Sequence, residues 1–179
     1  MKFFVTGVNG QLGHDVMNEL YKRGHEGVGS DIAEAYAGVA DGSPVTTMPY
    51  VSLDIINKDA VMKVIAEVKP DAVIHCAAWT AVDMAEDDDK VEAVRRVNAG
   101  GTQNIAVACK KVDCKMLYLS TDYVFDGQGT EPWKPDCKDY KPLNVYGKTK
   151  LEGEMAVSST LKKYFIIRIA WVFGLNGKN

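Results

Sequence analysis

The sequence has no excess of basic residues and no long apolar run. Its 21 Lys and Arg are outnumbered by 24 Asp and Glu, so the formal net charge is -3 at pH 7. Without a basic field, we expect no binding to nucleic acid or to an anionic membrane surface. Nowhere do about 18 apolar residues run together, so we expect neither a secretory signal nor a membrane-spanning helix. These absences favour a cytoplasmic protein.

Histidine and cysteine are scarce, and their spacing matches neither a zinc site nor a redox motif. The acidic run from Glu86 to Asp89 is explained by solvation at the start of a helix. We therefore assign no metal. The four cysteines are expected to be reduced thiols: Cys76, Cys109, Cys114 and Cys137.

The order of the apolar segments predicts an α/β fold. Short runs of β-forming residues alternate with segments of helical periodicity, and such strands favour a parallel sheet covered on both faces. We therefore predict one domain over residues 1–179, a doubly wound, three-layer α/β/α sheet of the Rossmann type. Residues 32–49 and 121–142 are expected to be loops. Strands are predicted at 2–6, 26–30, 50–53, 72–75, 115–120 and 164–169, and helices at 11–23, 58–68, 90–111 and 143–161.

A glycine-rich turn between the first strand and the first helix indicates a dinucleotide site. Gly7, Gly10 and Gly13 would permit a tight turn, close backbone approach to a pyrophosphate and close helix packing. A plain strand-to-helix turn is the alternative. Asp31, at the end of the second strand, is placed to bond an adenosine ribose, which favours NADH over NADPH. Asp54 would bond the adenine amino group or cap the following helix.

Tyr146 and Lys150 lie four residues apart in a predicted helix and share one face. Taken alone, this spacing is typical of a solvated surface pair. With a dinucleotide site upstream and Thr121 at the end of the fifth strand, it predicts a ketone reductase. Tyr146 would protonate the carbonyl oxygen, Lys150 would hold the nicotinamide ribose and lower the pKa of the phenol, and Thr121 would bond the same oxygen.

These residues lie within longer motifs that resemble the extended short-chain dehydrogenase/reductases, and within them the dTDP-4-dehydrorhamnose reductase family. The resemblance covers the whole chain. It implies reduction of the 4-keto group of dTDP-4-dehydro-L-rhamnose by NADH or NADPH, a nucleotide-sugar substrate, and compatibility with a homodimer. The motifs are TGVNGQLG at 6–13, AAWTAVD at 77–83, STDYVFDG at 120–127 and PLNVYGKTKLEGE at 142–154.

The resemblance also implies roles for individual residues. Thr121 and Asp122 would meet the sugar, and Trp171 would stack on it unless it packs in the core. Asn98 would kink its helix and help to hold the lysine through water, or would have no role there. Gly10, Gln11 and Leu12 would contact the phosphates of the cofactor, and Asp31 would contact its adenosine ribose. Asp54 and Ile55 would contact the adenine. The middle of the cofactor would be contacted by Ala78, Trp79 and Thr80.

Two other functions remain open from the sequence. One is a non-catalytic binding role like that of the regulatory β subunit of methionine adenosyltransferase. The other is a different nucleotide-sugar reductase or epimerase. We further expect that the C-terminal substrate-binding part of the family is absent from this chain.

Overall fold

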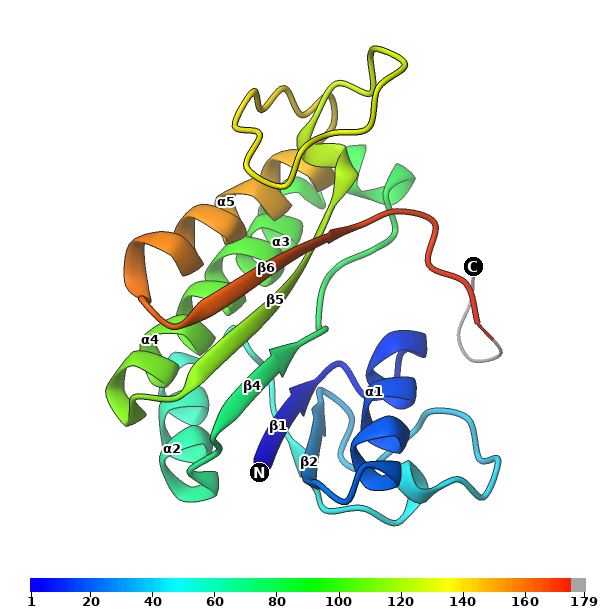
Figure 1. Ribbon diagram of the computed structural model, residues 1–179, viewed down its shortest axis with the longest axis vertical. Coiled ribbons are helices and arrows are strands. Elements are labelled where there is room, and N and C mark those ends of the chain that lie inside the picture. The colour runs from blue at the N-terminus through cyan, green and yellow to red at the C-terminus, as the bar shows by residue number, and fades with distance from the viewer. Residues whose placement is uncertain (175–179) are drawn as a thin grey trace.

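The computed structural model describes residues 1–174, which form an α/β fold around one parallel sheet. The strands of this six-stranded sheet lie in the order β3-β2-β1-β4-β5-β6 (Figure 1). The chain therefore starts in the middle of the sheet, winds outward to β3 and then returns to build the other half. The strands are β1 (Lys2–Thr6), β2 (Glu26–Asp31), β3 (Tyr50–Ser52), β4 (Ala72–His75), β5 (Lys115–Thr121) and β6 (Tyr164–Ile169).

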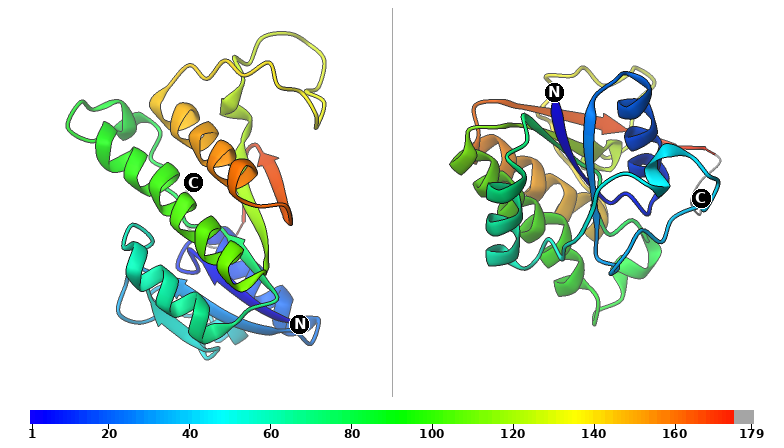
Figure 2. Two further views of the ribbon diagram at one scale, coloured as in Figure 1. Left: turned by 90° about the vertical axis from the view of Figure 1, so that its left-hand side faces the viewer. Right: turned by 90° about the horizontal axis from the view of Figure 1, so that it is seen from below.

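Helices cover the two faces of the sheet unequally. On one face lie α2 (Lys58–Val68), α4 (Thr102–Val112) and α5 (Val145–Thr160), as Figure 2 shows, whereas α1 (Gln11–Lys22) packs on the other face beside β1 and β2. Successive side chains of β1 point to opposite faces of the sheet and so pack against different helices. Phe4 packs with the first group of helices, and Val5 packs with α1. This three-layer arrangement confirms the predicted fold class.

The predicted strands and helices agree with the structure to within a few residues. Asn57 caps α2 by accepting a hydrogen bond from the backbone N–H of Ala60. The helix predicted from residue 143 begins later, at Val145, because Asn144 is its N-cap and Leu143 is 72% exposed.

The helix predicted over residues 90–111 differs most from expectation. It starts as α3 (Val91–Arg95), continues as a π-helical segment, η3 (Arg96–Gly101), and ends as α4. A π-helical segment inserts extra backbone into a helix and often marks a functional site. The predicted distortion near Asn98 is therefore confirmed.

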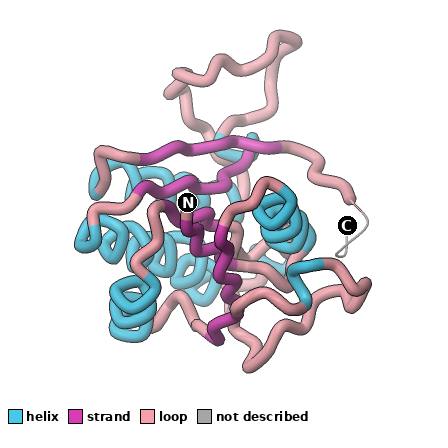
Figure 3. Tube along the Cα trace, turned by 60° about the horizontal axis from the view of Figure 1, so that its bottom comes forward, coloured by secondary structure: helices cyan, strands magenta, loops and turns pink. Residues whose placement is uncertain are grey.

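The long segment between β5 and α5 is a projecting loop. After a short 3-10 turn, η4 (Asp122–Val124), residues 125–144 extend from the body of the molecule (Figure 3). The remaining short elements are the 3-10 turns η1 (Pro44–Thr46) and η2 (Asp83–Glu86). The edge strand β6 leaves Phe165 and Ile167 65% and 42% exposed on the face opposite α5.

Candidate functional site

The glycine-rich turn is closely packed and leaves a helix N-terminus free. Gly7 has φ of +75°, and a Cβ on Gly7 or Gly13 would lie under 3.0 Å from backbone atoms, which real side chains essentially never do. Gly10 is the N-cap of α1, with no side-chain cap and no acidic residue in the first turn. The first N–H groups of α1 are thus available to an anion, as a pyrophosphate requires.

Asp31 lies at the carboxyl end of β2, beside this turn. Its carboxylate accepts hydrogen bonds from the backbone N–H groups of Asn9 at 3.0 Å and Ile32 at 2.8 Å. Asn9 in turn accepts from the N–H of Ala37 at 2.9 Å and so holds the following loop against the turn. The two backbone bonds orient the Asp31 carboxylate, and they leave lone pairs for a further donor.

Asp54 and Ile55 follow β3 at the same edge of the sheet. The Asp54 carboxylate accepts from the N–H of Ile56 at 3.0 Å. Because Asn57 is the N-cap of α2, the alternative that Asp54 caps this helix is wrong. Ile55 is 7% exposed, and its carbonyl accepts from Asn104 Nδ2 at 2.9 Å.

Asn98 connects the segment after β4 to the helix that carries Tyr146 and Lys150. Its Oδ1 accepts from the Trp79 N–H at 2.8 Å, and its Nδ2 donates to Thr149 Oγ1 at 3.1 Å. The side chain is 1% exposed, so the alternative that Asn98 has no role in its helix is wrong. Of the neighbouring residues, Ala78 is half-buried and Thr80 is exposed.

Thr121 and Tyr146 meet at the carboxyl end of β5. Thr121 Oγ1 donates to Asp122 Oδ1 at 3.1 Å and accepts from the Tyr123 N–H at 3.2 Å. The Tyr123 ring lies edge-on to the Tyr146 ring, with centroids 5.7 Å apart. Burial raises the pKa of Tyr146, with Asp122 adding to the effect and the Thr121 hydroxyl opposing it. This direction is opposite to the lowering that we expected from Lys150.

Lys150 is buried, so it is not part of a solvated surface pair. Lys150 is 3% exposed. Its Nζ donates to the Leu119 carbonyl at 2.5 Å and lies 4.3 Å from the centroid of the Tyr118 ring. Burial lowers the pKa of Lys150 to about 7, although Cys76 and Glu154 act to raise it. Near neutral pH, this amine can therefore exist in either protonation state.

Trp171 lies in the segment after β6 and is 91% exposed, so the alternative that it packs in the core is wrong. Just beyond it, the segment passes Gln11, since a Cβ on Gly174 would lie 2.7 Å from the Gln11 amide nitrogen. This contact brings the end of the described chain beside the glycine-rich turn.

Two groups in this region received no role from the sequence. Glu154 lies one helical turn after Lys150 and is paired with Arg168 of β6. His75 is 1% exposed between Thr6 and Thr102. Glu154 was marked in the sequence by its four-residue spacing from Lys150 and by its place at the end of the motif at 142–154, but its partner lies on another element. No motif marked His75.

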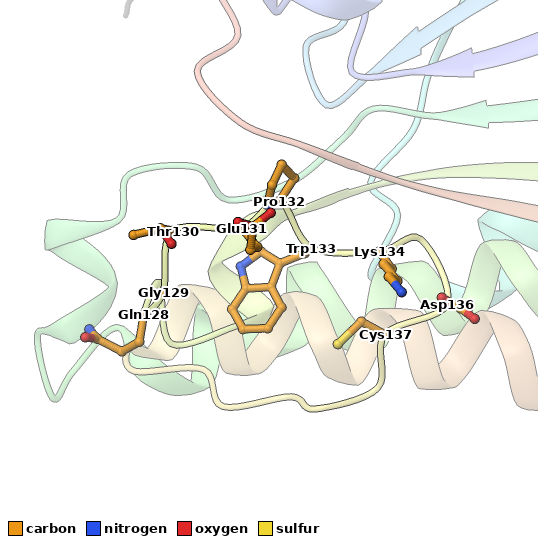
Figure 4. A pocket seen from close by; sticks show the side chains of 9 residues that line it. All are labelled: Gln128, Gly129, Thr130, Glu131, Pro132, Trp133, Lys134, Asp136 and Cys137. Carbon is orange, nitrogen blue, oxygen red and sulfur yellow. The ribbon is translucent and has the colours of Figure 1, made fainter.

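The loop after β5 contains a pocket of about 520 Å³ that none of the predicted site residues lines (Figure 4). Trp133 stacks on Phe125 with ring centroids 4.4 Å apart. The lining residues are Gln128, Gly129, Thr130, Glu131, Pro132, Trp133, Lys134, Asp136 and Cys137.

The four cysteines all have free thiols, as predicted. Within residues 1–174, no group of three or more His, Cys, Asp or Glu side chains is arranged to hold a metal ion. No helix in the same range is long and apolar enough to cross a membrane.

Comparison with known proteins gives the family. A family model described as "RmlD substrate binding domain" matches residues 1–179. A dTDP-4-dehydrorhamnose reductase from Streptomyces griseus is 37% identical over 99% of this chain and 52% of its own length. The chain thus spans about half the length of the curated relatives it matches.

Solved structures agree with this assignment. A dTDP-4-dehydrorhamnose reductase from Clostridium acetobutylicum superposes with a TM-score of 0.84 at 38% identity, over 100% of this chain and 56% of that one. The enzyme of the same name from Bacillus anthracis, in complex with NADP, gives 0.82 at 34% identity, over 99% and 56%. With its fold, its glycine-rich turn and these matches, the chain belongs to the RmlD substrate-binding domain family.

Proposed function

We propose that this chain carries the cofactor site and the proton-transfer groups of an NAD(P)H-dependent dTDP-4-dehydrorhamnose reductase. The observation that carries the proposal is the grouping of Thr121, Tyr146 and Lys150 at the carboxyl end of β5. The glycine-rich turn follows β1, so it lies at the same edge of the parallel sheet. Ligands of open α/β sheets bind at this edge.

The cofactor side of the proposal is supported by the fit of the turn to a pyrophosphate. Gly10, Gln11 and Leu12 would hold the phosphates, and the uncapped start of α1 supplies N–H donors. Asp31 would bond the adenosine ribose and favour NADH, whereas the relative from Bacillus anthracis was solved with NADP. Asp54 and Ile55 would contact the adenine. The middle of the cofactor would be contacted by Ala78, Trp79 and Thr80.

The chemistry follows from the protonation states of the chain's own groups. When bound, the reduced nicotinamide supplies a hydride for the keto carbon. Tyr146 would donate its proton to the carbonyl oxygen, since a phenol whose pKa is raised stays protonated at neutral pH. Thr121 would turn its hydroxyl proton from Asp122 Oδ1 to the same oxygen. Lys150, in its charged form, would hold the nicotinamide ribose.

The substrate side of the proposal extends beyond this chain. Asp122 and Trp171 would contact the deoxyhexose, and residues outside the chain would complete the nucleotide-sugar pocket. Two facts support this division: the matched relatives are about twice as long, and Trp171 and the β6 side chains Phe165 and Ile167 are exposed. A cytoplasmic location is part of the same proposal, supported by four free thiols.

Calorimetric titration of this chain with NADH and then NADPH tests the cofactor site. We expect binding of both, tighter for NADH, and a loss of that preference in Asp31→Ala. A folded sample that binds neither nucleotide would contradict the proposal for this chain and would favour the non-catalytic, partner-binding role.

Turnover of dTDP-4-dehydrorhamnose by the complete polypeptide tests the chemistry. Tyr146→Phe removes the proton donor and little contact area, so we expect turnover to disappear while NADH still binds. Tyr123→Phe is the matched control, because it removes a neighbouring phenol that we assign no proton-transfer role. Full activity of Tyr146→Phe would refute the mechanism.

A further inference from the structure

An ion pair lies behind Lys150, on the side away from Tyr146 along α5. Glu154 is 3% exposed and accepts two hydrogen bonds from Arg168, at 2.8 Å from Nε and 2.7 Å from Nη2. Tyr146, Lys150 and Glu154 are spaced four residues apart, so they follow one another along the same helix face. The proposed reduction assigns roles to Tyr146 and Lys150 and none to Glu154.

Arg168 also fastens the loop that joins Thr121 to α5. Its Nη2 donates to Tyr140 Oη at 2.9 Å, and its Nη1 donates to the Cys137 carbonyl at 3.4 Å. The guanidinium carbon lies 5.2 Å from the centroids of the Phe125 and Tyr140 rings. These contacts leave the guanidinium little freedom to move, so Glu154 is held toward β6.

The groups that face Lys150 from other elements carry no negative charge at neutral pH. From β4 and the residue after it come His75, whose pKa burial lowers to about 3, and Cys76, whose pKa burial raises to about 12. Tyr118 on β5 has its pKa raised by burial as well. Cys76 and Glu154 both act to raise the pKa of Lys150, but the Cys76 thiol is protonated at neutral pH, so Glu154 is the one of the two that carries a negative charge there.

We propose that the Glu154–Arg168 pair is a positioning device for Lys150. Glu154 favours the charged form of the buried Lys150 amine, and Arg168 keeps Glu154 from drawing that ammonium away from the Leu119 carbonyl. The pair thereby sets both the charge and the place of the lysine that would hold the nicotinamide ribose. This inference rests on the proposed function for its catalytic consequence.

A purely structural ion pair makes a different prediction. If Glu154 and Arg168 only tie α5 to β6, then removing the pair lowers stability and leaves the protonation equilibrium of Lys150 unchanged. The deciding measurement is therefore the titration midpoint of Lys150, which a structural role does not move.

Nuclear magnetic resonance of the chain with ¹³C-labelled lysine side chains measures this midpoint directly, with Lys150→Met assigning the signal. Glu154→Gln keeps the shape of the side chain and removes its charge. We expect the midpoint to fall by about 1 pH unit, the size of shift that a nearby opposite charge produces. Glu152→Gln is the matched control, because Glu152 lies on the same helix, 39% exposed, and is paired with Arg95. Equal midpoints in all three proteins would overturn the proposal.

Steady-state kinetics of the complete polypeptide tests the consequence for turnover. In Glu154→Gln the loss of kcat at alkaline pH should begin about 1 pH unit lower than in the unaltered protein. Arg168→Met should lower kcat, and the double variant with Glu154→Gln should recover part of it, since no carboxylate then competes for Lys150. A double variant no more active than Arg168→Met would refute the part assigned to Arg168.

The two proposals fail in different ways. An unaltered protein without turnover at any pH would overturn the proposed reductase, while the resonance titration would still decide whether Glu154 sets the charge of Lys150. An active protein whose Glu154→Gln variant keeps the same pH profile would overturn the positioning role and leave the reductase standing.

Discussion

The buried histidine at the end of β4 should make the stability of this chain fall as the solution is acidified. His75 is 1% exposed, and burial, with the Lys150 charge adding to it, lowers its pKa from 6.5 to about 3. Below pH 6.5 the unfolded histidine gains a proton that the folded one does not accept. The stabilisation is therefore fully present above pH 6.5 and is lost as the pH falls toward 3.

Hydrogen bonds explain why the folded ring stays neutral. Thr102 Oγ1 donates to the Asn98 carbonyl at 2.7 Å, so its lone pairs must receive the His75 Nε2–H at 3.1 Å. Because the neutral ring carries its proton on Nε2, its Nδ1 is an acceptor, and the Thr6 hydroxyl donates to it at 2.7 Å while accepting from the Ala77 N–H. A proton on Nδ1 would face this hydroxyl proton, which makes the charged form costly.

The magnitude follows from the difference between the two pKa values. Each pH unit within that interval changes the free energy of unfolding by about 1.4 kcal/mol. Because titration of the unfolded histidine is only beginning at pH 7, we expect a loss of about 2 kcal/mol between pH 7 and pH 5 from His75 alone. That is a substantial part of the total stability of a typical domain, about 5 to 15 kcal/mol.

Urea unfolding followed by circular dichroism at pH 5, 6 and 7 measures this loss. His75→Gln removes the titrating ring and should flatten the pH dependence by about 2 kcal/mol over that range. His25→Gln removes a histidine outside this network and serves as the matched control. The same slope in His75→Gln as in the unaltered chain would refute the reasoning, as would resonance signals of a protonated His75 ring in the folded chain at pH 5.

Three further variants test the packing that supports the site. In Gly13→Ala the new methyl group would collide with backbone atoms, so we expect a loss of about 1–3 kcal/mol of stability and weaker NADH binding by calorimetry. Gly100→Ala is its control, because a methyl group at Gly100 would meet no other atom within 4 Å. Ile105→Ala empties a site that is 0% exposed and should cost about 2–5 kcal/mol in urea unfolding; a loss below 1 kcal/mol would contradict this core assignment. Asn57→Ala removes the α2 cap bond and should cost about 1 kcal/mol, and an unchanged melting curve would show that water replaces that cap.

Local signals in the sequence were enough to predict the architecture. Periodicity located every strand of the sheet to within a few residues, since a buried parallel strand reads as a short apolar run. The glycines at positions 7, 10 and 13 predicted the turn, because turn geometry depends on adjacent residues. The grouping of Thr121 with Tyr146 was expected from strand order and motif resemblance.

Only the tertiary structure decided the electrostatics of the site. The buried state of Lys150, the raised pKa of Tyr146 and the neutral form of His75 all depend on how much water the surrounding elements exclude. The partner of Glu154 is on β6, and the partners of His75 are on β1 and in α4, far away in the chain. Residue spacing along one helix or strand carries no information about such contacts, so the protonation states in this chain become defined only when the sheet and its helices pack together.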